Sequence, residues 1–152
     1  MRASLRFFAL GIVLAGGCRQ GLAPQRIPLD QASCARCGML ISSSQNAAEV
    51  VFDDQDPLFY DDIGCLASDR ILSRGRFEVW VRVDGGSSWK KAGEAFFARP
   101  PEARTPMGFG FAAFSSADAA RAGDREGRAR TWRDVEREMA ARAERTAAGS
   151  SR

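Results

Sequence analysis

Phe77-Glu78-Val79-Trp80-Val81-Arg82-Val83 is the stretch that decides the fold, because apolar and polar residues alternate along its whole length. Successive side chains of an extended strand point to opposite faces, so this alternation gives one apolar and one polar face. No other part of the chain has so clear a strand pattern. The run 84–88, rich in glycine and serine, then turns the chain. The stretch therefore predicts a sheet strand with one face in the core.

Two short strands and a helix are expected before this stretch. The strands are short and apolar and form a hairpin across an aspartate-rich turn. The helix has apolar residues at helical spacing and an aspartate that can cap its first turn. The expected bounds are 47–52 and 58–60 for the strands, 63–74 for the helix, and Asp61 or Asp62 for the cap. The order strand, strand, helix, strand follows for the first half.

A similar order of elements is expected after the stretch. Two strands are joined by a proline-rich loop and followed by a short helix that a serine can cap. A charge-rich helix with Trp132, Val135 and Met139 at helical spacing closes the chain. The expected bounds are 89–98 and 107–114 for the strands, 117–123 for the helix, Ser115 or Ser116 for its cap, and 133–145 for the last helix. The sequence thus predicts an α+β fold of two similar ββαβ units with a C-terminal helix.

The N-terminus has the pattern of a secretion signal. Arg2 and Arg6 precede an apolar run over 7–15 that is too short to span a bilayer. Small residues then lead to Cys18, as in bacterial lipoproteins, where such a cysteine is lipidated after cleavage. An ordinary cleaved signal, with Cys18 as a free thiol, is the alternative. A lipidated Cys18 would anchor the protein to a membrane without spanning it, and Arg19 slightly favours the outer membrane.

Cleavage before Cys18 would leave 135 of the 152 residues and lower the formal net charge from +3 to +1. That length suits one domain of ordinary size. Arginines are matched by acids and form no basic stripe, so the composition gives no support for nucleic-acid binding. The predicted division is a signal peptide over 1–17, a lipidated tether over 18–28, a domain over 29–146 and a tail over 147–152.

A second informative stretch is Cys34-Ala35-Arg36-Cys37-Gly38-Met39, which gathers two thiols and a thioether in a chain without histidine. Soft sulfur donors select Cu(I) among the biological metals. Cys37 and Met39 share one face of an extended segment, and Gly38 can let their sulfurs converge. The spacing alone leaves another interpretation open, in which Cys34 and Cys37 form a disulfide or a redox pair while Met39 packs in the core.

Cys65 is the remaining thiol once Cys18 is lipidated, and it lies in the first turn of the expected helix. The positive end of a helix favours a thiolate there. Three thiols are an odd number for an exported protein, so at least one of them lies outside any intramolecular disulfide. A zinc site would fall short of the usual four ligands, because the chain offers three cysteines and no histidine, unless a carboxylate completes the set.

Several motifs resemble those of the NosL family, the nitrous oxide reductase accessory lipoproteins. In chain order these are Cys18, Cys34-Ala35-Arg36-Cys37-Gly38-Met39, Tyr60-Asp61-Asp62-Ile63-Gly64-Cys65-Leu66, and Thr105-Pro106-Met107-Gly108 with Ala112-Ala113-Phe114. The set spans most of the mature chain, and its order is more specific than any one motif. The resemblance implies two ββαβ units related to the organomercurial lyase fold. It also implies a periplasm-facing lipoprotein that passes Cu(I) to the machinery assembling the copper centres of the reductase.

The resemblance also assigns residues to the copper site. Cys37 and Met39 are implied as ligands, with Met107 as a further thioether donor. Supporting roles are expected for Cys34, Cys65 and Asp62. Asp61 and Asp62 can act as a plain helix cap or can also orient Cys65 or the loop that carries Met39. Because the chain has no histidine, a relative that completes its site with imidazole is no guide to the remaining coordination position.

Three functions are therefore compatible with the sequence. The first is a non-enzymatic copper metallochaperone that exchanges ligands with a copper-receiving apo-enzyme or its assembly machinery. The second is an exported thiol–disulfide oxidoreductase using Cys34 and Cys37, although such sites normally place the motif at the start of a helix, and Gly38 and serines follow here. The third is a non-catalytic anchored binding module whose cysteines are inert.

Overall fold

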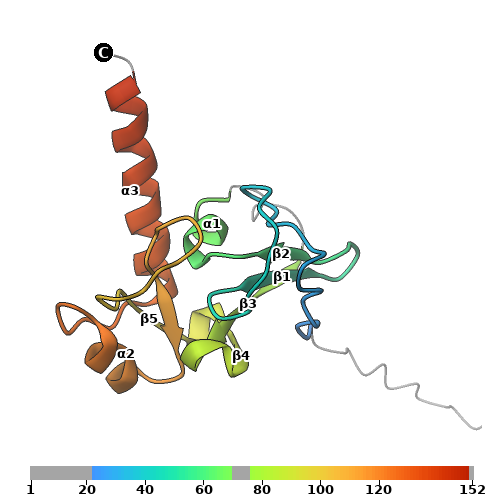
Figure 1. The fold of residues 1–152 in the computed structure, drawn as a ribbon, viewed down its shortest axis with the longest axis horizontal. Coiled ribbons are helices and arrows are strands. Elements are labelled where there is room, and N and C mark those ends of the chain that lie inside the picture. Colours follow the sequence, from blue (N-terminus) through green and yellow to red (C-terminus); the bar gives the residue numbers. More distant parts are fainter. Residues whose placement is uncertain (1–21, 70–75, 151–152) are drawn as a thin grey trace, which may run out of the picture.

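The computed structural model describes residues 22–69 and 76–150. The signal peptide, Cys18 and the first part of the tether lie outside the described residues. So do residues 70–74 of the helix expected over 63–74, and the described part of that helix already ends at Ala67, earlier than predicted. Within the described part, the chain is a mixed α+β structure with a six-stranded sheet and a long C-terminal helix (Figure 1).

The sheet has the strand order β2-β1-β3-β6-β5, with β4 also paired to β3. The strands are β1 (Ala48–Phe52), β2 (Leu58–Tyr60), β3 (Phe77–Val83), β4 (Ser88–Lys91), β5 (Phe96–Ala98) and β6 (Ala112–Phe114). All pairs are antiparallel except β3 with β6. The strands predicted at 77–83, 47–52 and 58–60 are confirmed, the second of them one residue shorter at its start.

β3 is the strand that connects the two halves of the sheet. On one side it pairs with β1 over residues 77–81 and with β6 at Val83, and on the other side it pairs with β4 over residues 80–83. Val81 and Val83 are buried on its inner face, as the alternating sequence predicts. Trp80 and Glu49 are register partners and therefore share the outer face. The segment before residue 28 covers this outer face.

That covering segment is the part of the predicted tether that the structure describes. Trp80 Nε1 donates to the Leu22 carbonyl oxygen at 2.8 Å, and the Gln25 amide donates to Glu49 Oε2 at 2.8 Å. Ile27 packs into the hydrophobic core. Glu49 is 0 % exposed beneath this segment. Residues 22–27 are therefore part of the folded domain.

The second half departs from the sequence prediction in two places. Residues 89–98 form two strands instead of one, separated by a 3₁₀ turn over Ala92–Glu94. The two strands pair with different partners, β3 and β6, so the chain must change direction between them. The strand predicted to begin at Met107 begins only at Ala112. Gly108 and Gly110 adopt positive φ angles of 68° and 73°, which a strand cannot contain.

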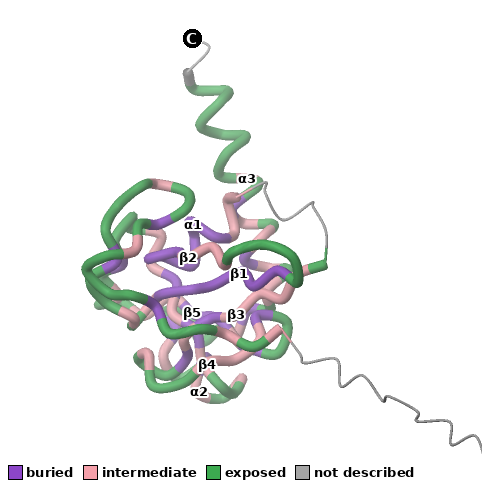
Figure 2. The backbone as a smooth tube through the Cα atoms, turned by 90° about the vertical axis from the view of Figure 1, so that its right-hand side faces the viewer, coloured by how far each residue is buried: buried purple, intermediate pink, exposed green. Residues whose placement is uncertain are grey.

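Three helices complete the described fold: α1 (Ile63–Ala67), α2 (Ala117–Gly123) and α3 (Trp132–Ser150). Asp62 caps α1 and Ser116 caps α2, each being one of the two caps expected. α1 packs against the start of α3, where Val135 and Met139 are buried. α3 continues to Ser150, beyond the predicted end of the domain at 146. Its last turns project from the body and are exposed (Figures 1 and 2).

Among the residues that the structure describes, none of the helices has the length and apolar character needed to cross a membrane.

Candidate metal-binding site

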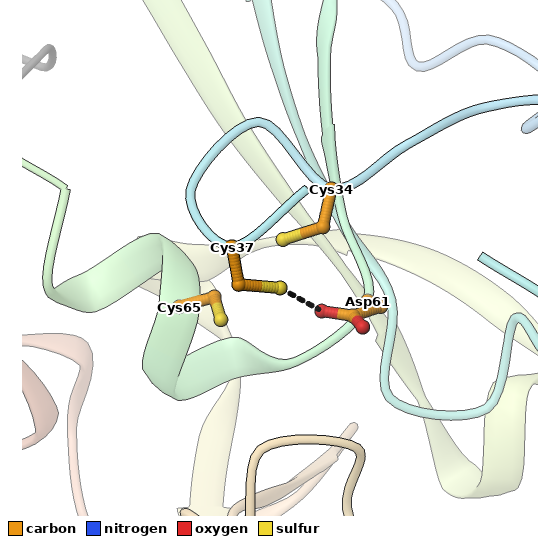
Figure 3. A group of neighbouring side chains, drawn as sticks. All are labelled: Cys34, Cys37, Asp61 and Cys65. Atoms are coloured by element: carbon orange, nitrogen blue, oxygen red, sulfur yellow. Dashed lines mark hydrogen bonds between the residues drawn. The ribbon is translucent and has the colours of Figure 1, made fainter. Parts of the chain in front are cut away.

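The loop that carries Cys34 and Cys37 is a tight hairpin. Ser33 and Leu40 form an antiparallel bridge, and the Cys34 amide donates to the Met39 carbonyl at 2.8 Å. Gly38 closes the turn with a φ of 76°, a left-handed conformation that glycine adopts without strain. These contacts direct the thiols of the loop toward β2 and α1 (Figure 3).

A backbone hydrogen bond joins this hairpin to β2. The Ala35 amide donates to the Phe59 carbonyl at 2.8 Å. β2 ends at Tyr60, and the chain then passes through Asp61 and Asp62 into α1. The hairpin therefore lies directly above the point where the chain leaves the sheet and enters the helix, which brings its thiols to the first turn of α1.

The candidate site is a cluster of Cys34, Cys37, Cys65 and Asp61, called the thiol cluster below. One ligand atom from each residue lies within 4.8 Å of every other (Figure 3). All three cysteines are free thiols. Cys34 and Cys65 are 2 % and 1 % exposed, whereas Cys37 is partly exposed. These four residues are able to hold a metal ion.

Asp61 is the carboxylate of the thiol cluster. The Cys37 thiol donates to its Oδ1 at 3.8 Å, a long and weak bond. Its Oδ2 is buried and has no hydrogen-bond partner among the described residues. Burial, together with the neighbouring Cys34, raises the pKa of Asp61 to about 6. A cation would satisfy this orphaned oxygen, so the donor set fits a metal ion.

The thiols of the cluster divide their protons unequally. Hydrogen bonding from Cys65 lowers the pKa of Cys34 to about 4, against the opposing effect of burial. The same hydrogen bond raises the pKa of Cys65, and burial raises that of Cys37. The thiolate therefore belongs to Cys34, and the effect of the helix end expected at Cys65 is outweighed. One thiolate held by neighbouring thiols is a ready starting point for binding a soft metal.

Asp62 has a different role from its neighbour. Its Oδ1 accepts the Gly64 amide at 2.8 Å as the cap of α1, and its Oδ2 accepts the Met107 amide at 3.1 Å. Asp62 therefore fixes the loop carrying Met107 against the start of α1. This contact is with the loop of Met107 and not with that of Met39, and a supporting role of Asp62 at a metal site stays a prediction.

The two predicted thioether ligands lie on exposed loops beside the cluster. Met39 is 45 % exposed and Met107 is 41 % exposed. Met39 and Asp61 line a common pocket of about 530 Å³, with Thr105 and Pro106 on its other side. Asp61 thus belongs both to the thiol cluster and to the wall of this pocket. Coordination by Met39 or Met107 stays a prediction.

The residues that the structure brings together differ in part from the ligands predicted from the sequence. Cys37 is a member of the cluster as expected. Cys34 and Cys65, which were assigned supporting roles, are its buried members. Asp61 was considered as half of an aspartate pair that caps the helix or also orients Cys65 or the loop of Met39, and not as a ligand. Its place immediately after a strand, next to the true cap, is the sequence signal that separates it from Asp62 in retrospect.

The fold and the thiol cluster define a mixed α+β protein with three free thiols and one carboxylate arranged so that they can hold a metal ion. No protein-family model matches the chain, and neither does any curated protein or solved structure.

Proposed function

We propose that this chain is a metallochaperone that binds Cu(I) through sulfur ligands and delivers it for assembly of the copper centres of nitrous oxide reductase. The observation that carries the proposal is the convergence of Cys34, Cys37 and Cys65, all free thiols, in a chain without histidine. Thiolate sulfur is the donor that best selects Cu(I). The chain acts by ligand exchange and is not an enzyme.

The exposure of the cluster suits release as well as capture. Cys34 and Cys65 are buried and protect the ion from solvent, while Cys37 is partly exposed and is the first thiolate that an incoming ligand can replace. Met39 and Met107 are exposed thioethers near this opening. They would hold the ion briefly during transfer, because thioethers are neutral soft donors.

The NosL-like motifs support nitrous oxide reductase as the recipient of the copper, and the order of the elements agrees with the architecture that this resemblance implies. β1, β2, α1 and β3 follow the ββαβ order, with β1 between β2 and β3. In the second half β5 pairs with β6 and, through Phe97, with Arg130 after α2. This equivalent pairing supports the duplicated architecture related to organomercurial lyases that the resemblance implies. The proposed setting is a lipid anchor at Cys18 that faces the periplasm, in the outer membrane.

Competition for Cu(I) tests the proposal. The purified, reduced chain is expected to withdraw one Cu(I) ion from a chromophoric chelator and to melt at a higher temperature when loaded, because a ligand of the native state stabilises it. Cys37→Ser is expected to lose affinity by about 100-fold, of the order of an important ligand contact. Cys18→Ser serves as the lipid-free parent for this comparison, because it leaves Cys34, Cys37 and Cys65 as the remaining thiols of the chain. Equal binding by both variants would refute the proposed site.

An oxidoreductase is the second candidate, because the lowered pKa of Cys34 provides a thiolate beside Cys37. Two features argue against it. Cys34 is buried, which hinders attack on a protein disulfide, and the pair lies on a hairpin turn, not at the start of a helix. Turnover of a disulfide substrate, lost in Cys34→Ser, would favour this candidate. Unchanged melting with Cu(I) and no turnover would favour an inert anchored module.

A further inference from the structure

The thiol cluster contains one donor more than Cu(I) needs. Three of its donors are sulfur atoms, and the fourth is the carboxylate of Asp61. Cu(I) is a soft ion that is best satisfied by sulfur alone, whereas carboxylate oxygen is a hard donor. The presence of a carboxylate within 4.8 Å of all three sulfurs therefore needs an explanation of its own.

We infer that the thiol cluster also binds Zn²⁺, with Cys34, Cys37 and Cys65 as three ligands and Asp61 as the fourth, whereas Cu(I) uses the thiolates without Asp61. The Cu(I) half of this statement rests on the proposed function, and the Zn²⁺ half does not. The ligand is a divalent ion that prefers four tetrahedral sulfur, nitrogen or oxygen donors.

The distances in the cluster suit such an ion. Zn–S bonds of about 2.3 Å place the sulfurs of a tetrahedral site about 3.8 Å apart. The four donor atoms already lie within 4.8 Å of one another, so closure on the ion requires movements of about 1 Å at most. Cys37 and Cys34 lie on a hairpin turn, and Asp61 and Cys65 lie on either side of the start of α1. Both segments can make a movement of this size without disturbing the sheet.

The net charge of the four-ligand complex differs between Zn²⁺ and Cu(I). Three thiolates and one carboxylate around Zn²⁺ leave a net charge of −2, but the same four ligands around Cu(I) leave −3. The additional uncompensated charge would be buried, because Asp61 is 3 % exposed and two of the thiols are nearly inaccessible. Burial of unpaired charge is costly. The carboxylate is therefore favourable beside the divalent ion and unfavourable beside the monovalent one.

The surroundings of Asp61 support a role toward a cation. Its Oδ2 is buried without a hydrogen-bond partner among the described residues, and its Oδ1 accepts a long bond from the Cys37 thiol. Capping of α1 is performed by Asp62, so the helix does not need this carboxylate. Buried polar atoms are nearly always paired in native proteins, and a bound cation would pair this one.

Titration of the full-length, reduced chain with Co²⁺, Zn²⁺ and Cu(I) tests the inference. Co²⁺ is the spectroscopic substitute for Zn²⁺, and we expect the ligand-field absorption of a tetrahedral, sulfur-rich ion. X-ray absorption of the Zn²⁺-loaded chain is expected to count three sulfur neighbours and one oxygen neighbour. An octahedral Co²⁺ spectrum, or a zinc shell without oxygen, would overturn the inference even if no variant could be purified.

Asp61→Asn provides the second part of the test. It should weaken Zn²⁺ and Co²⁺ binding by about 100-fold, because only the divalent ions use the carboxylate. It should leave Cu(I) affinity unchanged or raise it, because it removes a buried negative charge beside the monovalent ion. Asp54→Asn is the control, since it removes one negative charge on the exposed turn between β1 and β2. Equal losses for Zn²⁺ and Cu(I), or no loss for either, would overturn the inference.

The same titrations separate this inference from the proposed function. Zn²⁺ and Co²⁺ binding that depends on Asp61, with no uptake of Cu(I), would support the zinc site and refute the copper function. Tight Cu(I) binding with no tetrahedral Co²⁺ complex would refute the zinc site and leave the copper function standing.

Discussion

Asp61 and Asp62 are adjacent in the chain, but their carboxylates have different partners. Asp62 has extended backbone angles at the start of α1, so its side chain turns back to the Gly64 amide. Asp61 still follows the direction of β2, and its side chain reaches the thiols of the hairpin. The carboxylate of Asp62 therefore stabilises the fold, whereas that of Asp61 is the group whose chemistry depends on a bound ion.

Asp62 is expected to be the more costly helix cap to remove. Asp62→Ala leaves the Gly64 and Met107 amides without their acceptor, and we expect the free energy of unfolding to fall by about 2–3 kcal/mol. Ser116→Ala is the comparison, because Ser116 is an exposed cap with one bond, to the Ala119 amide, and should cost about 1 kcal/mol. Urea unfolding followed by tryptophan fluorescence measures both, and equal losses would contradict the bridging role of Asp62.

Glu49 is expected to make stability depend on pH. Burial raises the pKa of Glu49 from 4.5 to about 7. The folded state therefore holds this proton more tightly than the unfolded state, so the stabilisation is complete below pH 4.5 and is lost as the pH rises through about 7. Glu49→Gln should exceed the unfolding free energy of the parent by less than about 1 kcal/mol at pH 5 and by about 3 kcal/mol at pH 8.

The check for Glu49 is a series of urea unfolding curves between pH 5 and 8 for the parent and for Glu49→Gln. Glu102→Gln, on an exposed loop, is the control and should leave the pH dependence unchanged. A constant difference between the parent and Glu49→Gln across this range would contradict the prediction.

At the residue scale, the sequence indicated the sulfur donors of the site, but it did not indicate all of the side chains that lie beside them. The sulfur-rich stretch of Cys34, Cys37 and Met39 and the aspartate cap were evident from local spacing, but the hairpin that carries the two cysteines was not. The partnership of Asp61 with these thiols depends on a contact across 24 residues, which no local pattern encodes. The burial of Glu49 likewise depends on a contact with Gln25, 24 residues away along the chain.

At the element scale, the contact between α1 and the loop of Met107 is possible because Gly64 has no side chain. A Cβ atom at Gly64 would lie 2.2 Å from Cγ of Phe109. Arg142 of α3 covers the other part of that ring, with its guanidinium 5.0 Å from the centroid. Phe109 thus joins α1, α3 and the loop beside the thiol cluster.

Gly64→Ala is therefore expected to displace Phe109 and lower the free energy of unfolding by about 1–3 kcal/mol, as overpacking does in other cores. Gly93→Ala is the control, because nothing lies within 4 Å of the added Cβ. It should change stability by less than about 0.5 kcal/mol. Unfolding curves test both variants, and a stable Gly64→Ala protein would show that the loop is free to move.

Elements were predictable where one pattern was sufficient. β3 alternates over seven residues, and its prediction is confirmed to the residue. β5 and β6 have three residues each, and their bounds are set by pairing with each other and by the turns beside them. Strands this short are defined by their partners, so a pattern read along the chain merges or extends them.

At the scale of the whole molecule, Arg130 joins the last helix to the edge of the sheet. Its guanidinium bonds Asp124 before it and Glu138 on α3, while its backbone pairs with Phe97 of β5. Asp124 also accepts the Arg99 amide, and these bonds hold its pKa well below its usual range. The second half of the sheet and α3 are therefore held together by a buried ionic junction as well as by apolar packing.

α3 itself divides into a part that closes the core and a part that does not. Val135 and Met139 are buried against the body, whereas residues 143–149 are exposed. Met139→Ala is expected to cost about 2–5 kcal/mol, because it leaves a cavity in the core. Deletion of residues 143–152 is expected to cost less than about 1 kcal/mol, since it removes helical turns without buried contacts.

Thermal and urea unfolding of the two variants measure this division, and Cu(I) uptake by the shortened chain shows whether the thiol cluster survives. The cluster contacts the hairpin and α1, and α1 rests on the buried part of α3, so the shortened chain should retain its metal affinity. A large loss of stability or affinity on deletion of 143–152 would mean that the projecting turns support the body. In that case they would contribute to the site from outside the core.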